Sequence, residues 1–183
     1  MGQLSLWLLR HAKAVSDPPS GGSDFDRVLA PRGKRDSKAL GKLIGRDAAL
    51  LAAGVPLPQI ALVSPAARTA ATAELALAEL PAPPLTHLVD DLYGAEPEEV
   101  LDHLRTLPGS ITSVMVVGHN PTVHALSQGL IDADDTDGHD LALRRGFPTC
   151  ALGVYAFSVE HWHDVGARTA RLAGLSIPPF ENS

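Results

Sequence analysis

Short apolar runs alternate with longer helix-like segments along this chain, and this alternation limits the folds open to it. Strands are predicted over residues 3–10, 60–63, 85–89, 114–117 and 151–159. Helices are predicted over residues 31–53, 66–80, 97–107 and 121–131. Strands and helices in alternation are typical of a mainly parallel sheet with helices on both faces. The predicted fold class is therefore α/β, a three-layer α/β/α sandwich around a mainly parallel central sheet.

Prolines and glycines mark where the predicted helices begin and end. Pro31 suits a first helical turn, and Gly54 suits a C-terminal cap. Asn120 is predicted to cap the last helix, with Pro121 as its first residue. The Pro- and Gly-rich stretch 16–26 and the acidic stretch 132–140 are predicted as loops. Whether residues 167–183 pack on the rest of the chain is left open.

Composition and charge narrow the class of protein. With 183 residues, 45% of them hydrophobic, the chain is expected to form one domain over residues 1–183. A formal charge of −6 argues against a nucleic-acid partner, and the single cysteine, Cys150, forms no intrachain disulfide. The N-terminal apolar run is too short to span a membrane and no cleavage site follows it. A cytoplasmic protein without a membrane partner is expected, and the oligomeric state is left open.

Basic side chains follow three of the predicted strands. Arg10 and His11 end the first strand, His119 follows the strand over 114–117, and Arg68 lies in the first turn after the second strand. Ligands of open parallel sheets bind outside the carboxyl ends of the strands. We therefore expect these groups to converge at one point, suited to binding a phosphoryl group and attacking it.

Phosphoryl transfer requires fixed positive charge around the non-bridging oxygens. Arg10 and Arg68 can each donate two hydrogen bonds to them, and His119 can donate another. His11 is left as the nucleophile, since neighbouring guanidinium groups lower an imidazole pKa and keep it neutral. Attack would form a phosphohistidine on the enzyme, which water would hydrolyse. Because the arginines supply the charge, no metal or cofactor is expected.

Two further residues are predicted to contribute to this site. Lys13 follows the Arg-His pair closely and is predicted to attract anions, although a surface lysine would have the same pattern. The helix that opens at Asn120 is predicted to offer N–H groups to the phosphoryl oxygens.

Three segments of the chain resemble the signature segments of the histidine phosphatase superfamily, which has the phosphoglycerate-mutase-like fold. They read Leu9-Arg-His-Ala12, Ser64-Pro-Ala-Ala-Arg-Thr-Ala70 and Val117-Gly-His-Asn-Pro121. Ala12 stands where the family usually has glycine. The opening Arg-His-Ala-Lys and the segments 26–29 and 32–33 look most like the bacterial phosphohistidine phosphatases of the SixA type. The resemblance implies a nucleophilic His11, a phosphate pocket of Arg10, Arg68 and His119, and a phosphohistidine protein as substrate.

The proton donor is the open question of the predicted site. Family enzymes that cleave phosphate esters use a carboxylic acid to protonate the leaving oxygen. Asp90 and Asp91 lie about where that acid is expected, and Glu96 is a third candidate, but all three are equally consistent with solvated turn residues. A phosphohistidine substrate makes such an acid less necessary, because its imidazole can carry its own proton. A phosphatase of small phosphate esters and a non-catalytic phosphate-binding module are the alternative functions.

Two patterns that suggest a metal are set aside. His161, His163 and Asp164 lie close in sequence, but alternating histidines are more typical of a surface than of a metal site. The acidic stretch 132–138 resembles a calcium loop, but its spacing is off by one and Leu143 occupies the place of the closing glutamate.

Overall fold

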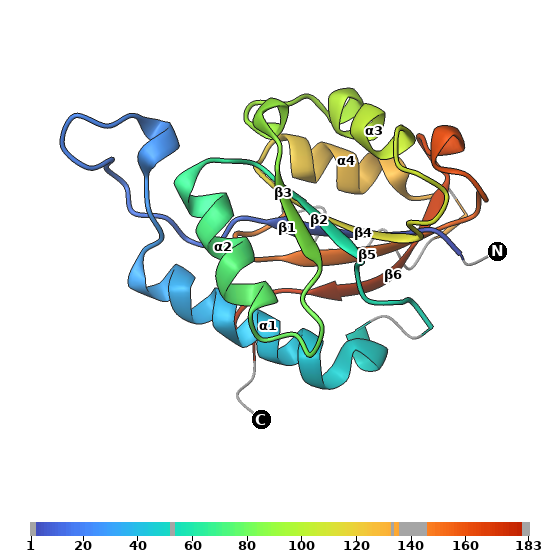
Figure 1. Cartoon of the computed structure of the whole chain (residues 1–183), viewed down its shortest axis with the longest axis horizontal. Coiled ribbons are helices and arrows are strands. Elements are labelled where there is room, and N and C mark those ends of the chain that lie inside the picture. Colours follow the sequence, from blue (N-terminus) through green and yellow to red (C-terminus); the bar gives the residue numbers. More distant parts are fainter. Residues whose placement is uncertain (1–2, 52–53, 133, 136–145, 181–183) are drawn as a thin grey trace.

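The computed structural model describes residues 3–51, 54–132, 134–135 and 146–180. Within them lie a six-stranded sheet and four α-helices (Figure 1). The strands are β1 (Ser5–Arg10), β2 (Ile60–Val63), β3 (Leu85–Leu88), β4 (Ser113–Gly118), β5 (Leu152–Phe157) and β6 (Ala170–Ser176). The helices are α1 (Pro31–Leu51), α2 (Ala67–Leu77), α3 (Pro97–Arg105) and α4 (Thr122–Leu130).

The sheet is mainly parallel, as predicted. Its strand order is β3-β2-β4-β1-β5-β6. The first four strands in this order run parallel, and β5 is antiparallel to both β1 and β6. Arg10 of β1 lies level with Gly118 of β4, and Val63 of β2 lies level with Val117. The carboxyl ends of these three strands therefore meet at one edge of the sheet.

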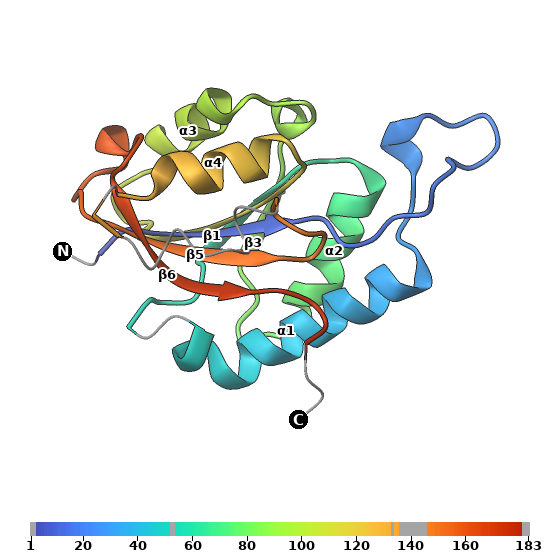
Figure 2. The same ribbon diagram turned by 180° about the vertical axis from the view of Figure 1, so that it is seen from behind.

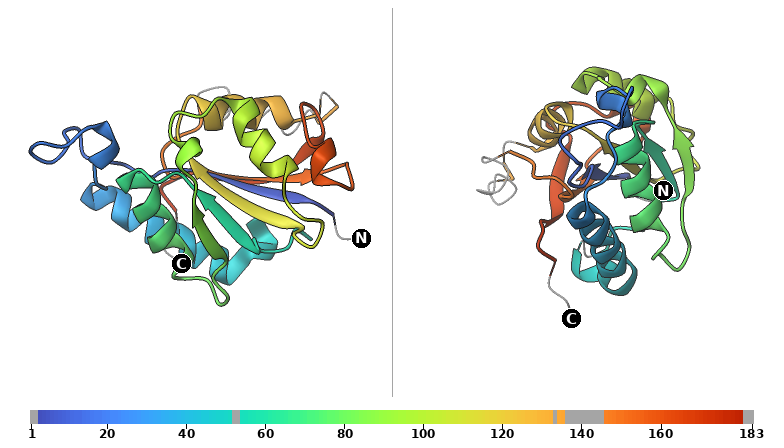
Figure 3. Two further views of the ribbon diagram at one scale, coloured as in Figure 1. Left: turned by 45° about the horizontal axis from the view of Figure 1, so that its top comes forward. Right: turned by 90° about the vertical axis from the view of Figure 1, so that its left-hand side faces the viewer.

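The helices form a layer on each face of the sheet, which confirms the predicted three-layer architecture. Figures 1 and 2 show α1 and α2 on one face and α3 and α4 on the other, and Figure 3 gives two further views of the same layers. Successive residues of a strand point to opposite faces, so Trp7 and Leu9 pack with the α1–α2 layer while Leu6 and Leu8 pack with the α3–α4 layer. Burial on both faces explains why β1 reads as a continuous apolar run.

The differences from the sequence prediction lie at the ends of elements and in one missed strand. Helices α2 and α3 end at Leu77 and Arg105, earlier than predicted, and the last two residues of the segment 31–53 lie outside the described residues. Most of the predicted acidic loop over 132–140 also lies outside them. The strand β6, in the segment whose packing the sequence left open, pairs with β5 along the sheet edge.

None of the helices that the structure describes is long and apolar enough to cross a lipid bilayer.

The rings of His161 and His163 stack, with centroids 5.2 Å apart. Over the described ranges, no group of three or more histidine, cysteine, aspartate or glutamate side chains is arranged to hold a metal ion.

Candidate active site

The structure brings the four main predicted site residues together at the carboxyl edge of the sheet. Arg10 is the last residue of β1 and His11 follows it, His119 follows β4, and Arg68 is the second residue of α2. The ring centroids of His11 and His119 lie 5.3 Å apart. A cavity of about 550 Å³ opens beside them. Its described lining residues are Arg10, His11, Lys13, Ala14, Asp24, Arg27, Arg68, Tyr93, Gly94, His119, Asn120 and Thr149.

The backbone next to His11 sets the protonation state of its ring. Nδ1 lies 2.8 Å from the carbonyl oxygen of Ala12. Because a carbonyl oxygen only accepts hydrogen bonds, Nδ1 carries the proton and Nε2 keeps its lone pair. The side chain is buried, and burial together with Arg68, Arg10 and Arg27 lowers the pKa of His11 to about 4 despite the Ala12 carbonyl. His11 is therefore a neutral imidazole with an unprotonated Nε2 at physiological pH.

His119 has both ring nitrogens engaged. Its Nδ1 lies 3.3 Å from Nη2 of Arg68, and its Nε2 lies 2.8 Å from Oγ of Ser64. A guanidinium only donates, so Nδ1 accepts and Nε2–H donates to Ser64. Burial, His11 and Arg68 lower the pKa of His119 to about 3. The N–H expected to contact a phosphoryl oxygen points instead at Ser64, which directly follows β2 and had no predicted role.

Arg68 is held by a loop residue whose role the sequence did not reveal. Its Nη1 donates to the carbonyl oxygen of Asp24 at 2.6 Å, and its Nη2 donates to Oδ2 of the same residue at 2.9 Å. Burial alone would raise the pKa of Asp24, but the ion pair with Arg68 and the hydrogen bonds from Arg27 and Tyr93 hold it below its usual range. Asp24 is therefore an ionised carboxylate at the wall of the cavity.

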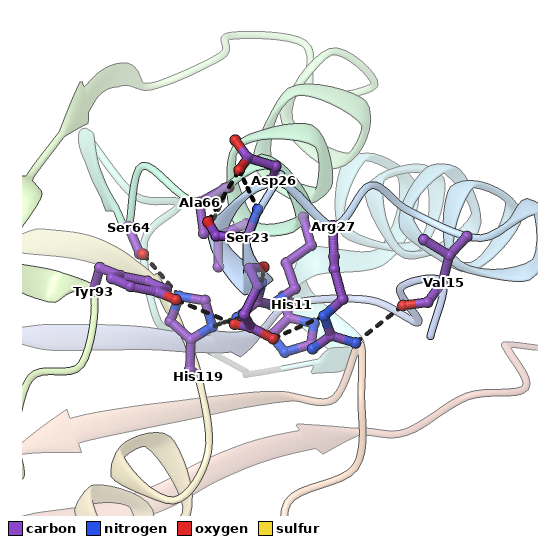
Figure 4. A network of polar contacts seen from close by, with 12 residues as sticks. His11, Val15, Ser23, Asp26, Arg27, Ser64, Ala66, Tyr93 and His119 are labelled. Atoms are coloured by element: carbon purple, nitrogen blue, oxygen red, sulfur yellow. Dashed lines mark hydrogen bonds and ion pairs between the residues drawn. The ribbon is translucent and has the colours of Figure 1, made fainter. Parts of the chain in front are cut away.

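The loop over 16–26 is fixed to the site through Asp24 and its neighbours, and Figure 4 shows Arg27, Tyr93 and His119 of this network. Arg27 donates to Oδ1 of Asp24 at 2.8 Å, and the Tyr93 hydroxyl donates to Oδ2 at 3.2 Å. The Tyr93 ring also meets Phe25 and His119 edge-on, at centroid distances of 5.0 and 5.6 Å. The segment predicted as a loop therefore supplies Asp24 to the site, and Arg27, which directly follows it, adds a second charged side chain.

Arg10 and Asn120 share one backbone acceptor ahead of β5. Nη1 of Arg10 and Nδ2 of Asn120 donate to the carbonyl oxygen of Phe147, at 2.7 and 3.0 Å. The prediction that Asn120 caps α4 is therefore wrong: its side chain turns to Phe147, and the cap position is taken by Pro121. Asn120 still lines the cavity. The sequence did not predict this role of Phe147, because the acceptor is a backbone carbonyl, which every residue carries.

The segment that carries His11 is packed firmly against two helices. The backbone N–H of Ala12 donates to Oγ1 of Thr72 at 2.9 Å, and this hydroxyl donates to the carbonyl oxygen of Arg68 at 2.6 Å. On the other side, a Cβ added to Gly33 of α1 would lie 2.2 Å from the carbonyl oxygen of Lys13. Glycine is required at position 33 because the two backbones approach this closely.

The predicted acids lie away from the lining of this cavity. Asp90 and Asp91 are exposed and line a neighbouring cavity of about 590 Å³ together with Glu99 and Asp102. Glu96 caps α3 and lines an adjoining apolar cavity of about 110 Å³, which shares Gly94, His119 and Asn120 with the cavity beside His11. Lys13 is exposed and does line the cavity beside His11.

Comparison with known proteins gives relatives over nearly the whole chain. No family model matches it. An uncharacterised protein of Mycobacterium tuberculosis H37Rv, Rv1276c, is 34% identical over 171 residues, which cover 93% of this chain and 99% of the relative.

Solved structures with the same fold include two candidate phosphohistidine phosphatases named SixA. The protein from Nakamurella multipartitia superposes with a TM-score of 0.77 at 29% identity, covering 98% of each chain. The protein from Agrobacterium tumefaciens has the same TM-score and identity, over 97% of this chain and 99% of that one. Phosphoglycerate mutase from Plasmodium falciparum shares the fold, with a TM-score of 0.58 at 16% identity, over 100% of this chain and 98% of that one. In its fold and its motifs, the chain is similar to the SixA proteins, which are members of the histidine phosphatase superfamily.

Proposed function

We propose that this protein is a metal-independent phosphatase that forms a covalent phosphohistidine at His11 and dephosphorylates phosphohistidine in another protein. The observation that carries the proposal is the hydrogen bond from Nδ1 of His11 to the Ala12 carbonyl. It leaves Nε2 with a lone pair in a side chain that lines a cavity rich in guanidinium groups. A neutral imidazole in such surroundings is an activated nucleophile that needs no separate base.

In the first step, the lone pair of His11 Nε2 forms a bond to phosphorus. The bond from phosphorus to the leaving group breaks, and its electron pair goes to the leaving atom. Arg10, Arg68 and Arg27 stabilise the negative charge on the non-bridging oxygens during transfer. Fixed guanidinium groups supply this stabilisation, which is the argument for chemistry that does not depend on a metal ion.

In the second step, water attacks the phosphoryl group on His11. The P–N bond breaks and its electron pair returns to Nε2, while the protons of the attacking water leave with phosphate and solvent. The proton stays on Nδ1, hydrogen-bonded to the Ala12 carbonyl throughout, so the imidazole leaves as a neutral group. A neutral leaving imidazole makes the intermediate easier to hydrolyse.

Two observations support a phosphohistidine protein as substrate. The cavity lining described by the structure holds one carboxyl side chain, Asp24, which stays ionised and so cannot protonate an alkoxide. Phosphohistidine needs no such donor, because its own ring carries a proton. The likeness to two candidate SixA phosphohistidine phosphatases points to the same substrate class.

The alternatives are a phosphatase of small phosphate esters and a module that binds phosphate without turnover. Asp90 and Asp91 lie near the site on the neighbouring cavity, and a movement of their turn toward His11 would favour the ester. The unprotonated Nε2 of His11 argues against a module that only binds, because binding alone does not require a free nucleophile.

The test is phosphate release, measured in EDTA, from a phosphohistidine protein, from phosphoserine and phosphotyrosine peptides, and from small sugar phosphates. His11→Ala should abolish release, and Arg68→Ala should reduce both release and affinity for inorganic phosphate. His87→Ala, at an exposed histidine of β3, is the matched control and should behave as wild type. Unchanged release in His11→Ala would refute the mechanism, and preferential release from an ester would refute the substrate.

A further inference from the structure

Asp24 holds an ionised carboxylate at the mouth of the site with one acceptor position still free. A carboxylate offers about four lone-pair positions. Oδ1 accepts from Arg27, and Oδ2 accepts from Arg68 and from Tyr93. One position on Oδ1 remains, and the side chain is 56% exposed along a cavity that it lines.

The pocket can bind a phosphoryl group while Asp24 stays in place. Arg10 uses Nη1 for the Phe147 carbonyl, and Arg27 uses Nε for Asp24 and Nη1 for the Val15 carbonyl. Within the described residues, Nη2 of each arginine has no hydrogen-bond partner. Both side chains line the cavity, so a phosphoryl group has donors beyond the two nitrogens of Arg68 that hold Asp24.

We propose that Asp24 is a specificity-determining residue, which accepts a hydrogen bond from the protonated imidazole of a phosphohistidine substrate and so selects this substrate over phosphate esters. The inference rests on the proposed function and names the side chain that distinguishes phosphohistidine from a phosphate ester. A negative carboxylate attracts the cationic, phosphorylated imidazolium ring of the substrate. A phosphate ester carries no such positive charge and has no N–H to donate.

The chemistry of the first step balances with this assignment. The phosphorylated nitrogen of the substrate ring is bonded to phosphorus, and the other ring nitrogen carries a proton that faces Asp24. When His11 Nε2 bonds to phosphorus, the substrate P–N bond breaks and its electron pair stays on the substrate nitrogen. The imidazole leaves neutral, with its remaining N–H still donated to Asp24, so no proton needs to move.

The first experiment compares kcat/KM for a phosphohistidine peptide and for p-nitrophenyl phosphate, whose leaving group needs no proton donor. Asp24→Asn keeps the size of the side chain and removes its charge. It should lower the ratio of kcat/KM for phosphohistidine to kcat/KM for the ester about tenfold or more. Asp17→Asn, an exposed change in the same loop with the same change of charge, is the control and should alter neither.

Two outcomes of this experiment would overturn the proposal. If Asp24→Asn lowers kcat/KM for both substrates by the same factor, Asp24 only holds Arg68 and the loop in position. If it raises kcat/KM for both by the same factor, Asp24 only competes with phosphate for Arg68.

A binding measurement separates this proposal from the proposed function. In a His11→Ala background, which cannot be phosphorylated at that position, calorimetry compares a phosphohistidine peptide with the matching phosphoserine peptide. Asp24 should confer a preference for phosphohistidine, and Asp24→Asn should remove it. Equal affinities with Asp24 present would refute the inference. Absence of turnover by the wild-type protein, with this preference intact, would refute only the proposed hydrolysis.

Discussion

Replacing Thr72 by valine removes a hydroxyl group that joins the His11 segment to α2. Thr72 is fully buried, and its Oγ1 both accepts from the backbone N–H of Ala12 and donates to the carbonyl oxygen of Arg68. Valine has nearly the same shape, so packing changes little. The Ala12 N–H then loses its acceptor inside the protein.

The magnitude follows from the cost of one unpaired buried donor, about 1–3 kcal/mol. For a chain of this length, each kcal/mol corresponds to about 2–4 °C in Tm. We expect Thr72→Val to lower the free energy of unfolding by about 1–3 kcal/mol and Tm by about 2–12 °C. Because Ala12 adjoins His11, phosphate release should also fall.

The assay is urea unfolding, followed by circular dichroism, with Thr69→Val of the same helix as the matched control. Thr69 is also fully buried, but its hydroxyl donates only to the carbonyl oxygen of Ala66, which already accepts two backbone N–H groups. Its loss should cost less than about 1 kcal/mol, since no buried donor loses its acceptor. Equal stabilities of the two variants would refute the role assigned to the Thr72 hydroxyl.

Three further predictions concern the same site. The pKa of His11 at about 4 and of His119 at about 3 lie below 6.5, so the folded chain binds fewer protons than the unfolded one between these values. The free energy of unfolding should therefore fall as the pH drops from 6.5 toward 4, and an NMR titration that places both pKa values near 6.5 would contradict this. Gly33→Ala should destabilise the protein by about 1–3 kcal/mol in thermal unfolding, while Gly109→Ala, with open space around it, should not. Ser64→Ala should lower the rate of phosphate release with little change in the free energy of unfolding, because the His119 ring loses the hydrogen bond that orients it. An unchanged rate would exclude a role for Ser64 in orienting His119.

The fold was largely predictable because its central strands are buried on both faces. Burial of β1 and β4 imposes continuous apolar runs, and the groups that end these runs must meet at the sheet edge. The strand β6 was missed because it lies at an edge and is only partly buried, so its sequence carries little periodicity.

The site was predictable only where strand ends determine position. Arg10, His11 and His119 adjoin strand ends, and Arg68 lies in the turn of helix after one. Asp24 reaches Arg68 across 44 positions of sequence, through a loop whose path depends on tertiary contacts. Local pattern does not encode such a path, nor which of two adjacent cavities the turn at Asp90 faces.

Arg10 and Asn120 share the backbone carbonyl of Phe147 as acceptor, and this affects how substitutions at position 147 would change activity. The carbonyl that fixes Arg10 and Asn120 belongs to the backbone, so every residue at position 147 retains it, while the fully buried ring serves the core. A mutational scan would score this position by hydrophobic volume and class it as structural. Loss of activity there would reflect displacement of the main chain, and would follow insertions or deletions nearby more closely than changes of side chain.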